Sequence, residues 1–300
     1  MNLKFKEISI FKDITKITQI NKGWSFDMKY KIETNNKTYM LRTAPLDKYK
    51  VKEAEYKLIE TLYQKGLSTH EPIEFGLCDN GQTTFLLLEY IEGDQAELIL
   101  PSLTIEKQYQ LGLKMGKELK EIHKLNYTLE NNWTEQYKKK IISRIDAFRK
   151  CGFKSEIMNE IIEFVEKNTY LLFNRSTSQS HGDFHSGNLI ITPEENIYII
   201  DYNRMKIGDP YYEFNRIYFS YRISPYFAKG QIEGYFNNDI PDDFFLYLKF
   251  YLLSVMIGNI PWAMMYDQTD VDFAKESIDE VYEEYNNLKD TIPKWFMDAK

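Results

Sequence analysis

Apolar and polar positions alternate along two neighbouring stretches near the start of the chain, residues 27–34 and 37–43. A period of two places every second side chain on one face, which is typical of half-buried strands. The residues between the two stretches, Asn35 and Asn36, favour a tight turn. The pattern therefore predicts a β-hairpin.

The next residues continue a small β-rich region. A helix is predicted over 50–65, and two more strands are predicted over 72–76 and 83–90. Gly93 closes this region. We therefore predict a small, β-rich N-terminal lobe that spans residues 1–93.

Beyond this lobe the pattern becomes helical. After Thr104 apolar residues recur every three or four positions, at Leu111, Met115, Leu119 and Ile122. Helices are also predicted over 157–173 and over most of 212–288, with a short β-hairpin over 188–200 between them. The fold class predicted is α+β, with a larger, mostly helical C-terminal lobe over residues 94–300.

Composition places the chain among ordinary globular proteins, because 43% of its 300 residues are apolar and 28% are charged. Two cysteines, Cys78 and Cys151, cannot build a disulfide framework. Residues 1–13 mix Lys, Glu and Asp with apolar residues, unlike a signal peptide. The most apolar stretch, 244–260, is interrupted by Lys249 and predicts a buried helix. We therefore expect a cytoplasmic protein without a membrane partner.

Acidic residues are concentrated towards the C-terminus. From Pro225 onward the chain has 6 basic and 14 acidic side chains, within a total net charge of −7. A nucleic acid partner is not expected, because its phosphates require a basic surface. The acidic C-terminal part would suit a cationic substrate, although a solvated acidic helix face accounts for the charge equally well.

One segment carries the residue types that phosphoryl transfer requires. His181-Gly182-Asp183 is followed by Asn188, and Asp201 ends the next predicted strand. The reaction needs a carboxylate that orients the attacking hydroxyl and accepts its proton, and oxygen ligands for Mg²⁺. The hairpin between Asn188 and Asp201 would bring both ligands to one edge.

The same segment allows two other interpretations. His181 and His185 are four residues apart, as in a helical zinc site, but the Glu of that motif is missing and Gly182 disfavours a helix. In the second interpretation, Asp183 and Asn188 cap a structural turn. Both account for fewer of the residues than phosphotransfer does.

The stretches HGDFHSGN, IIDYN and GDP resemble the aminoglycoside phosphotransferase and choline kinase family, which has the two-lobed protein-kinase-like fold. The resemblance covers nearly the whole chain. It implies that Asp183 is the catalytic base and that Asn188 and Asp201 bind Mg²⁺. His185 and Ser186 would either contact phosphates or, as we prefer, shape the loop.

The N-terminal lobe, residues 1–93, adds to the resemblance, which implies that this lobe binds the nucleotide. Gly23, Trp24 and Ser25 resemble the loop that covers the nucleotide, where backbone N–H groups approach phosphate oxygens. Arg42 falls where the family places a phosphate-contacting residue that is usually Lys. A guanidinium can hold two phosphate oxygens, so this departure is compatible with function.

The rest of the implied nucleotide site follows Arg42. Glu55 resembles the carboxylate that pairs with this basic residue, and Glu53 is its rival. Glu89, Tyr90 and Ile91 resemble the connection between the lobes, where backbone groups would bind the adenine. Nothing in these residues distinguishes ATP from GTP.

Other positions depart from the family or are interpreted as structural. The family often has a second acid where this chain has Asn203, and an Asp where it has Glu213. Asp209 is interpreted as a helix cap or loop anchor.

The sequence leaves the substrate open. The first hypothesis is phosphorylation of an aminoglycoside-type antibiotic, which the acidic C-terminal part favours. The second is a metabolite kinase for choline, ethanolamine or a sugar, with Trp262, Tyr266 and Tyr212 as contributors to a cation–π cage. The third is a nucleotide-binding module without catalysis.

Overall fold

The computed structural model describes residues 3–21, 27–125 and 132–299. These residues form two compact units. The first combines Met1–Ile99 with Gly187–Met205, and the second combines Leu100–Ser186 with Lys206–Lys300. The lobe boundary predicted after residue 93 stays a prediction.

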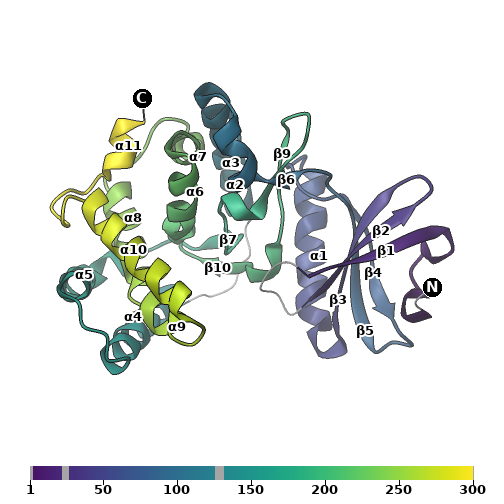
Figure 1. Ribbon diagram of the computed structural model, residues 1–300, viewed down its shortest axis with the longest axis horizontal. Helices are drawn as coiled ribbons and strands as arrows, with labels where there is room; N and C mark the ends of the chain where they lie inside the picture. Colours follow the sequence, from purple (N-terminus) through teal and green to yellow (C-terminus); the bar gives the residue numbers. More distant parts are fainter. Residues whose placement is uncertain (1–2, 22–26, 126–131, 300) are drawn as a thin grey trace. The chain divides into compact units, whose positions relative to one another are not determined.

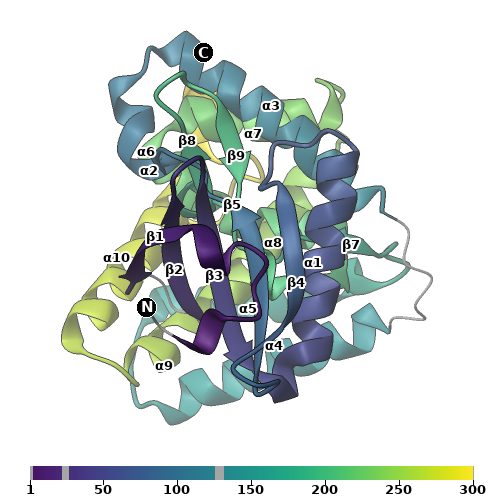
Figure 2. The same cartoon turned by 90° about the vertical axis from the view of Figure 1, so that its right-hand side faces the viewer.

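The first unit is built on a five-stranded antiparallel sheet with the strand order β1-β2-β3-β5-β4 (Figure 1). Its strands are β1 (Ile14–Ile20), β2 (Met28–Thr34), β3 (Thr38–Pro45), β4 (Pro72–Cys78) and β5 (Thr83–Glu89). Helix α1 (Tyr49–Gln64) packs against β3, β4 and β5 (Figure 2). The predicted hairpin, helix and two later strands are all present. β1 was not predicted.

Strand register separates the two faces of this sheet. Leu41 of β3 pairs with Tyr30 on β2 and Leu87 on β5, and Leu41 and Leu87 belong to the buried core cluster that also contains Phe5. One position further along, Lys29 pairs with Arg42. Because successive side chains point to opposite faces, Lys29 and Arg42 lie on the other face.

A small second sheet belongs to the same unit. It has the order β6 (Asp94–Gln95), β8 (Leu189–Ile191) and β9 (Ile197–Ile199). The backbone N–H of Ile199 also donates to the carbonyl of Ser68 at 2.8 Å. These bonds explain why residues 187–205 join the N-terminal unit although the chain has already passed through several helices.

The second unit is mostly helical (Figure 1). Its helices are α3 (Ile105–His123), α4 (Trp133–Lys150), α5 (Glu156–Lys167), α6 (Ile217–Ile223), α7 (Pro225–Phe236), α8 (Phe244–Met256), α9 (Asn259–Ala263), α10 (Gln268–Glu284) and α11 (Lys294–Asp298). A two-stranded sheet pairs β7 (Ser178–Ser180) with β10 (Lys206–Gly208). The short helix α2 (Ala96–Ile99) belongs to the first unit.

The helix predicted over 157–173 is shorter in the structure. α5 ends at Lys167, and a 3₁₀ helix follows over Thr169–Leu172. Asn168 is the C-cap of α5: its backbone N–H donates to the carbonyls of Phe164 and Val165 at 3.2 Å, and its side chain also donates to the carbonyl of Phe164 at 2.8 Å. Helix α4 was not predicted.

The apolar stretch near residue 250 forms α8 and α9. By length and composition alone, Phe244–Ala263 could cross a membrane, but 67% of its most apolar window is buried inside the protein. Core helices of soluble proteins pass the same test, so this match is weak support for a span. The predicted buried helix is present.

Candidate active site

The β8–β9 hairpin places Asn188 and Asp201 at one end. Leu189 pairs with Ile199, and the N–H of Ile200 donates to the carbonyl of Asn188 at 3.1 Å. Asp201 follows directly in a left-handed conformation with φ 66°. Non-glycine residues rarely adopt this conformation, and such strain is concentrated at functional sites.

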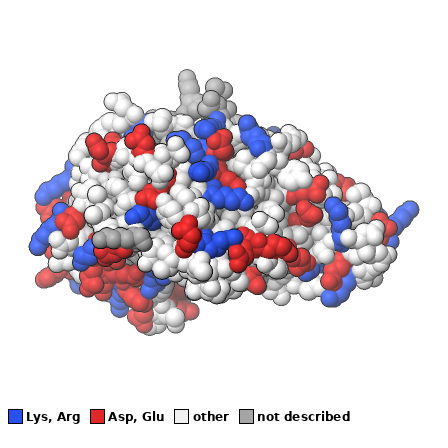
Figure 3. All heavy atoms as spheres, turned by 90° about the horizontal axis from the view of Figure 1, so that it is seen from above, with Lys and Arg blue, Asp and Glu red and all other residues white. Residues whose placement is uncertain are grey.

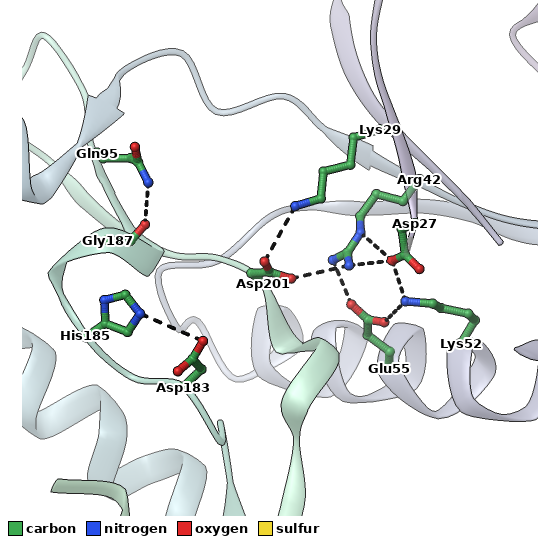
Figure 4. A network of polar contacts seen from close by, with 10 residues as sticks. All are labelled: Asp27, Lys29, Arg42, Lys52, Glu55, Gln95, Asp183, His185, Gly187 and Asp201. Atoms are coloured by element: carbon green, nitrogen blue, oxygen red, sulfur yellow. Dashed lines mark hydrogen bonds and ion pairs between the residues drawn. The ribbon is translucent and has the colours of Figure 1, made fainter. Parts of the chain in front are cut away.

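Asp201 lies against the face of the sheet that carries Lys29 and Arg42 (Figure 4). Its Oδ1 is 3.3 Å from Nη2 of Arg42, and its Oδ2 is 3.6 Å from Nζ of Lys29. The two cations come from paired positions on β2 and β3. The structure therefore brings Arg42 and Asp201 together.

Arg42 is buried and bonds to carboxylates on three sides. Its Nη1 donates to Oε1 of Glu55 at 2.8 Å, and its Nη2 donates to Oδ2 of Asp27 at 2.6 Å. Burial alone would lower the pKa of Arg42, but the charges of Glu55, Asp201 and Asp27 raise it above its ordinary value. The guanidinium is therefore permanently charged.

The structure decides between the two glutamates of α1. Glu55 is buried and bonds Arg42, whereas Glu53 accepts from Lys57 at 2.9 Å on the solvent side. Residues two apart on a helix do not share a face, so only one of the pair could face the sheet.

Lys52 and Asp27 complete this network, and sequence reasoning missed both. Lys52 is buried, and its Nζ donates to Oδ2 of Asp27 at 2.5 Å and to Oε2 of Glu55 at 2.8 Å. The spacing of three residues between Lys52 and Glu55 is a signal that the sequence did contain. Asp27 precedes a strand and has no such local partner.

The predicted adenine-binding segment follows β5. The N–H of Glu89 donates to Glu71, the carbonyl of Glu89 accepts from the ring of His70 at 2.9 Å, and the N–H of Tyr90 donates to Thr38. These bonds engage the N–H groups of Glu89 and Tyr90, whereas the carbonyl oxygen of Glu89 can still accept a second hydrogen bond. Burial lowers the pKa of His70 to about 4, so its ring is neutral at physiological pH.

Three predicted residues, Gly23, Trp24 and Ser25, lie outside the described residues.

Asp183 belongs to the second unit. Arg216, which sequence reasoning did not single out, places its Nε 3.0 Å from Oδ1 of Asp183. The Nε2 of His185 is 3.8 Å from Oδ2 of the same carboxylate, and the ring of His185 packs on Phe219. These contacts fix the orientation of the predicted catalytic carboxylate.

The loop that carries Asp183 is anchored by Glu213. The N–H of Gly182 donates to Oε1 of Glu213 at 2.9 Å, and Gly182 has φ 89°, which favours glycine. Burial would raise the pKa of Glu213, but His123, His181 and the N–H of Gly182 lower it below its ordinary value. Glu213 is therefore charged. This glutamate, which stands where the family often has an Asp, has a structural role.

Ser186 and Asp209 also have structural contacts. The Oγ of Ser186 donates to the carbonyl of Phe219 at 3.2 Å. Asp209 caps the 3₁₀ helix Pro210–Arg216 by accepting from the N–H of Tyr211, and the hydroxyl of Tyr251 donates to it. Both arrangements agree with the loop-shaping and capping interpretations.

The sequence matches the phosphotransferase enzyme family (APH) over residues 16–245. The chain belongs to this family. No curated protein matches it.

Several solved structures share the fold of this phosphotransferase. A variant of aminoglycoside 2′-phosphotransferase-IIIa bound to GDP has a TM-score of 0.68 at 15% identity, with 95% of each chain covered. Spectinomycin phosphotransferase APH(9)-Ia, in complex with ADP and spectinomycin, has a TM-score of 0.62 at 16% identity, with 96% of this chain and 94% of that chain covered. A protein from Haemophilus somnus, provisionally assigned as a fructosamine-3-kinase, has a TM-score of 0.59 at 15% identity, with 89% and 90% covered.

At these identities the likeness shows the fold alone. The α+β fold class and the kinase-like arrangement, with a five-stranded antiparallel sheet followed by a mostly helical part, are confirmed. The predicted family is confirmed as well.

The side chains at the end of the β8–β9 hairpin are of the types that bind Mg²⁺. Asn188 and Asp201 offer an amide and a carboxylate oxygen, the hard ligands that Mg²⁺ prefers. Within residues 3–21, 27–125 and 132–299 no group of three or more His, Cys, Asp or Glu side chains could hold a metal. Mg²⁺ in a phosphotransferase needs few protein ligands because substrate phosphates supply the others, whereas a structural zinc site needs four.

Proposed function

We propose that this phosphotransferase moves the γ-phosphoryl group of ATP or GTP to a hydroxyl of a small, cationic molecule, most readily an aminoglycoside-type antibiotic. The observation that carries the proposal is the buried Arg42, whose guanidinium lies between Glu55 and the strained Asp201. In this arrangement a permanent cation lies beside the carboxylate that we propose as a metal ligand, and this combination supports binding of a nucleotide polyphosphate.

The chemical step follows from the residues of the second unit. Asp183 accepts the proton of the substrate hydroxyl while the oxygen forms a bond to the γ-phosphorus and the bond to the leaving nucleoside diphosphate breaks. Arg216 and His185 hold the carboxylate of Asp183 in position. Bound Mg²⁺, held by Asn188 and Asp201, would neutralise phosphate charge.

The choice of nucleotide is supported by the related structures. Their complexes contain ADP in spectinomycin phosphotransferase and GDP in the 2′-phosphotransferase. For this chain we infer use of ATP, with GTP as an alternative. We expect the reaction in the cytoplasm, where a consequence would be resistance to the modified antibiotic.

The substrate is inferred from charge. Acidic side chains gather in one patch of the face shown in Figure 3 (lower left). Helix α10 contributes exposed acids, namely Asp272, Glu276, Asp279 and Glu283. Arg222 pairs with Glu276 and with Glu280, so these two carboxylates are already partly neutralised. The other exposed acids supply the surplus that favours a polyamine-like substrate.

A metabolite kinase is the second candidate function. The fold likeness to a provisionally assigned fructosamine-3-kinase favours it, since a sugar-like alcohol is then a possible acceptor. For a choline substrate, Trp262 and Tyr266 lie 4.6 Å apart between ring centroids. Tyr212 does not join them in an open cage, because it is buried against Trp133 and other rings.

The test is nucleoside diphosphate release with Mg-ATP or Mg-GTP over a panel of aminoglycosides, choline, ethanolamine and sugars. Asp183→Ala should lower kcat by at least about a hundredfold, because general base catalysis contributes that much, and should keep nucleotide affinity. Turnover equal to that of the parent would refute the role of Asp183. No release with any aminoglycoside would refute the substrate class. Nucleotide binding without any turnover would support the third candidate, a non-catalytic module.

A further inference from the structure

Three hydrogen-bond donors converge on a single oxygen of Asp27. Its Oδ2 accepts from Nη2 of Arg42 at 2.6 Å, from Nε of Arg42 at 3.1 Å and from Nζ of Lys52 at 2.5 Å (Figure 4). A guanidinium edge and an ammonium group directed at one anionic oxygen form the donor set that also binds a phosphate oxygen.

Glu55 fixes the two cations from the opposite side. Its Oε1 accepts from Arg42 and its Oε2 accepts from Lys52, both at 2.8 Å. Glu55 is 1% exposed and lies within α1, so it is a permanent part of this arrangement. Asp27 differs from it, because its side chain is 8% exposed and it lies just before β2 rather than inside an element.

The charges of the network are balanced while Asp27 is in place. Lys29, Arg42 and Lys52 supply the cations, and Asp27, Glu55 and Asp201 supply the anions. A neutral cluster attracts a polyphosphate weakly. If Asp27 leaves, the remaining side chains have an excess of one positive charge, which favours an anion in its place.

We propose that Arg42 and Lys52 form a two-cation site for a phosphate group of the nucleotide, and that the carboxylate of Asp27 occupies this site until the nucleotide displaces it. Lys52 is then a second phosphate-binding cation beside Arg42, and Asp27 is an internal competitor that lowers nucleotide affinity. The inference rests on the proposed function, since it assigns residues of the same nucleotide site.

Isothermal titration with ATP and with adenosine, with Mg²⁺ present, tests both parts. Asp27→Asn keeps the shape of the side chain and removes its charge, so ATP affinity should rise by about fivefold or more, the lower range of site-to-site coupling. Lys52→Met should weaken ATP binding by a similar factor. Adenosine affinity should stay unchanged in both variants, because adenosine has no phosphate.

Matched controls come from the same part of the chain. Asp47→Asn removes an exposed carboxylate that pairs with Lys48, and Lys57→Met removes an exposed lysine that pairs with Glu53 on α1. Neither control should alter ATP affinity by more than about twofold, because exposed pairs contribute little.

The roles proposed for Asp27 and for Lys52 can be refuted independently. ATP affinity of Asp27→Asn equal to or weaker than that of Asp47→Asn would overturn the role of Asp27 as competitor. Unchanged ATP binding by Lys52→Met, or an equal change for adenosine, would overturn the role of Lys52. Failure of the wild-type protein to bind ATP or GTP would instead refute the proposed function itself.

Discussion

Glu213 shows how one buried residue controls the geometry of a catalytic loop. Its carboxylate accepts from the N–H of Gly182, next to Asp183, and its Oε2 is 3.6 Å from Nε2 of His123 on α3. His123 in turn contacts the hydroxyl of Tyr235 at 2.8 Å. A chain of buried contacts therefore connects the loop to two helices of the unit, and the loop is positioned by residues that do not touch the substrate.

The Glu213→Gln variant tests whether Glu213 positions the loop that carries Asp183. The amide oxygen can still accept from Gly182, but the charge that faces His123 is lost, so the loop should shift. We expect kcat to fall by about tenfold or more, because small displacements at a reacting centre are costly, and KM for the nucleotide to stay constant. Steady-state kinetics measures kcat and KM separately.

Glu163→Gln is the matched control, since Glu163 is exposed and pairs only with Lys167 of its own helix among the ion pairs of the described residues. Unchanged kcat in Glu213→Gln, or an equal loss in both variants, would contradict the positioning role.

At the scale of elements, helices α3 and α7 approach closely because four glycines face each other. These are Gly112, Gly116, Gly230 and Gly234. A Cβ at Gly116 would lie 2.1 Å from the carbonyl oxygen of Gln231. Backbone cannot move aside as a flexible side chain can, so the contact requires glycine.

Gly116→Ala tests this contact because two effects oppose each other. Helix propensity alone predicts that alanine is more stable by about 1 kcal/mol. The clash predicts a net loss of about 1–3 kcal/mol, the typical cost of overpacking. Thermal or urea unfolding decides the sign. Lys117→Ala, at an exposed neighbouring position, should be nearly neutral. A stabilised Gly116→Ala variant would show that the helices can separate at low cost.

At the scale of the whole molecule, the apolar segment around α8 is part of the core of the second unit, and a lysine is buried inside it. Lys249 is 2% exposed, and its Nζ donates to the carbonyl oxygens of Leu288 at 2.8 Å and Asp290 at 2.9 Å. Burial lowers the pKa of Lys249 to about 8, although Asp290 acts in the opposite direction. The lysine therefore ties the chain after α10 to the core with a charge that is costly to bury.

This pKa gives global stability a defined pH dependence. Between pH 8 and the usual lysine pKa near 10.5 the unfolded chain binds more protons than the folded one, so this group adds stability as pH rises. The melting temperature of the wild-type protein relative to Lys249→Met should therefore increase from pH 7.5 to about 9.5, and stay level below about pH 7.

Lys289→Met, at an exposed position of the same region, should show no such trend relative to the wild type. A difference between wild type and Lys249→Met that does not depend on pH, or that falls as pH rises, would contradict the assignment.

Local patterns in the sequence determined most of the fold. The alternation over 27–43 and the helical period over 50–65 are properties of short stretches, and the structure has β2, β3 and α1 at these places. The spacing between Asn188 and Asp201 likewise determined that a hairpin brings both to one end. The family resemblance rested on contiguous residues and was confirmed by the family match.

Long-range contacts decided the rest. Asp201 is far from its partner Arg42 in sequence, and packing of the β8–β9 hairpin beside the sheet brings the two together. Asp27 reaches Arg42 through the pairing of β2 with β3. Arg216 beside Asp183 and Glu213 beside Gly182 come from another part of the chain in the same way. The sequence by itself determined which residues could perform phosphotransfer, because residue type and spacing are local. Only the tertiary structure decided which charges surround them, because electrostatic contacts depend on distance in space and not on distance along the chain.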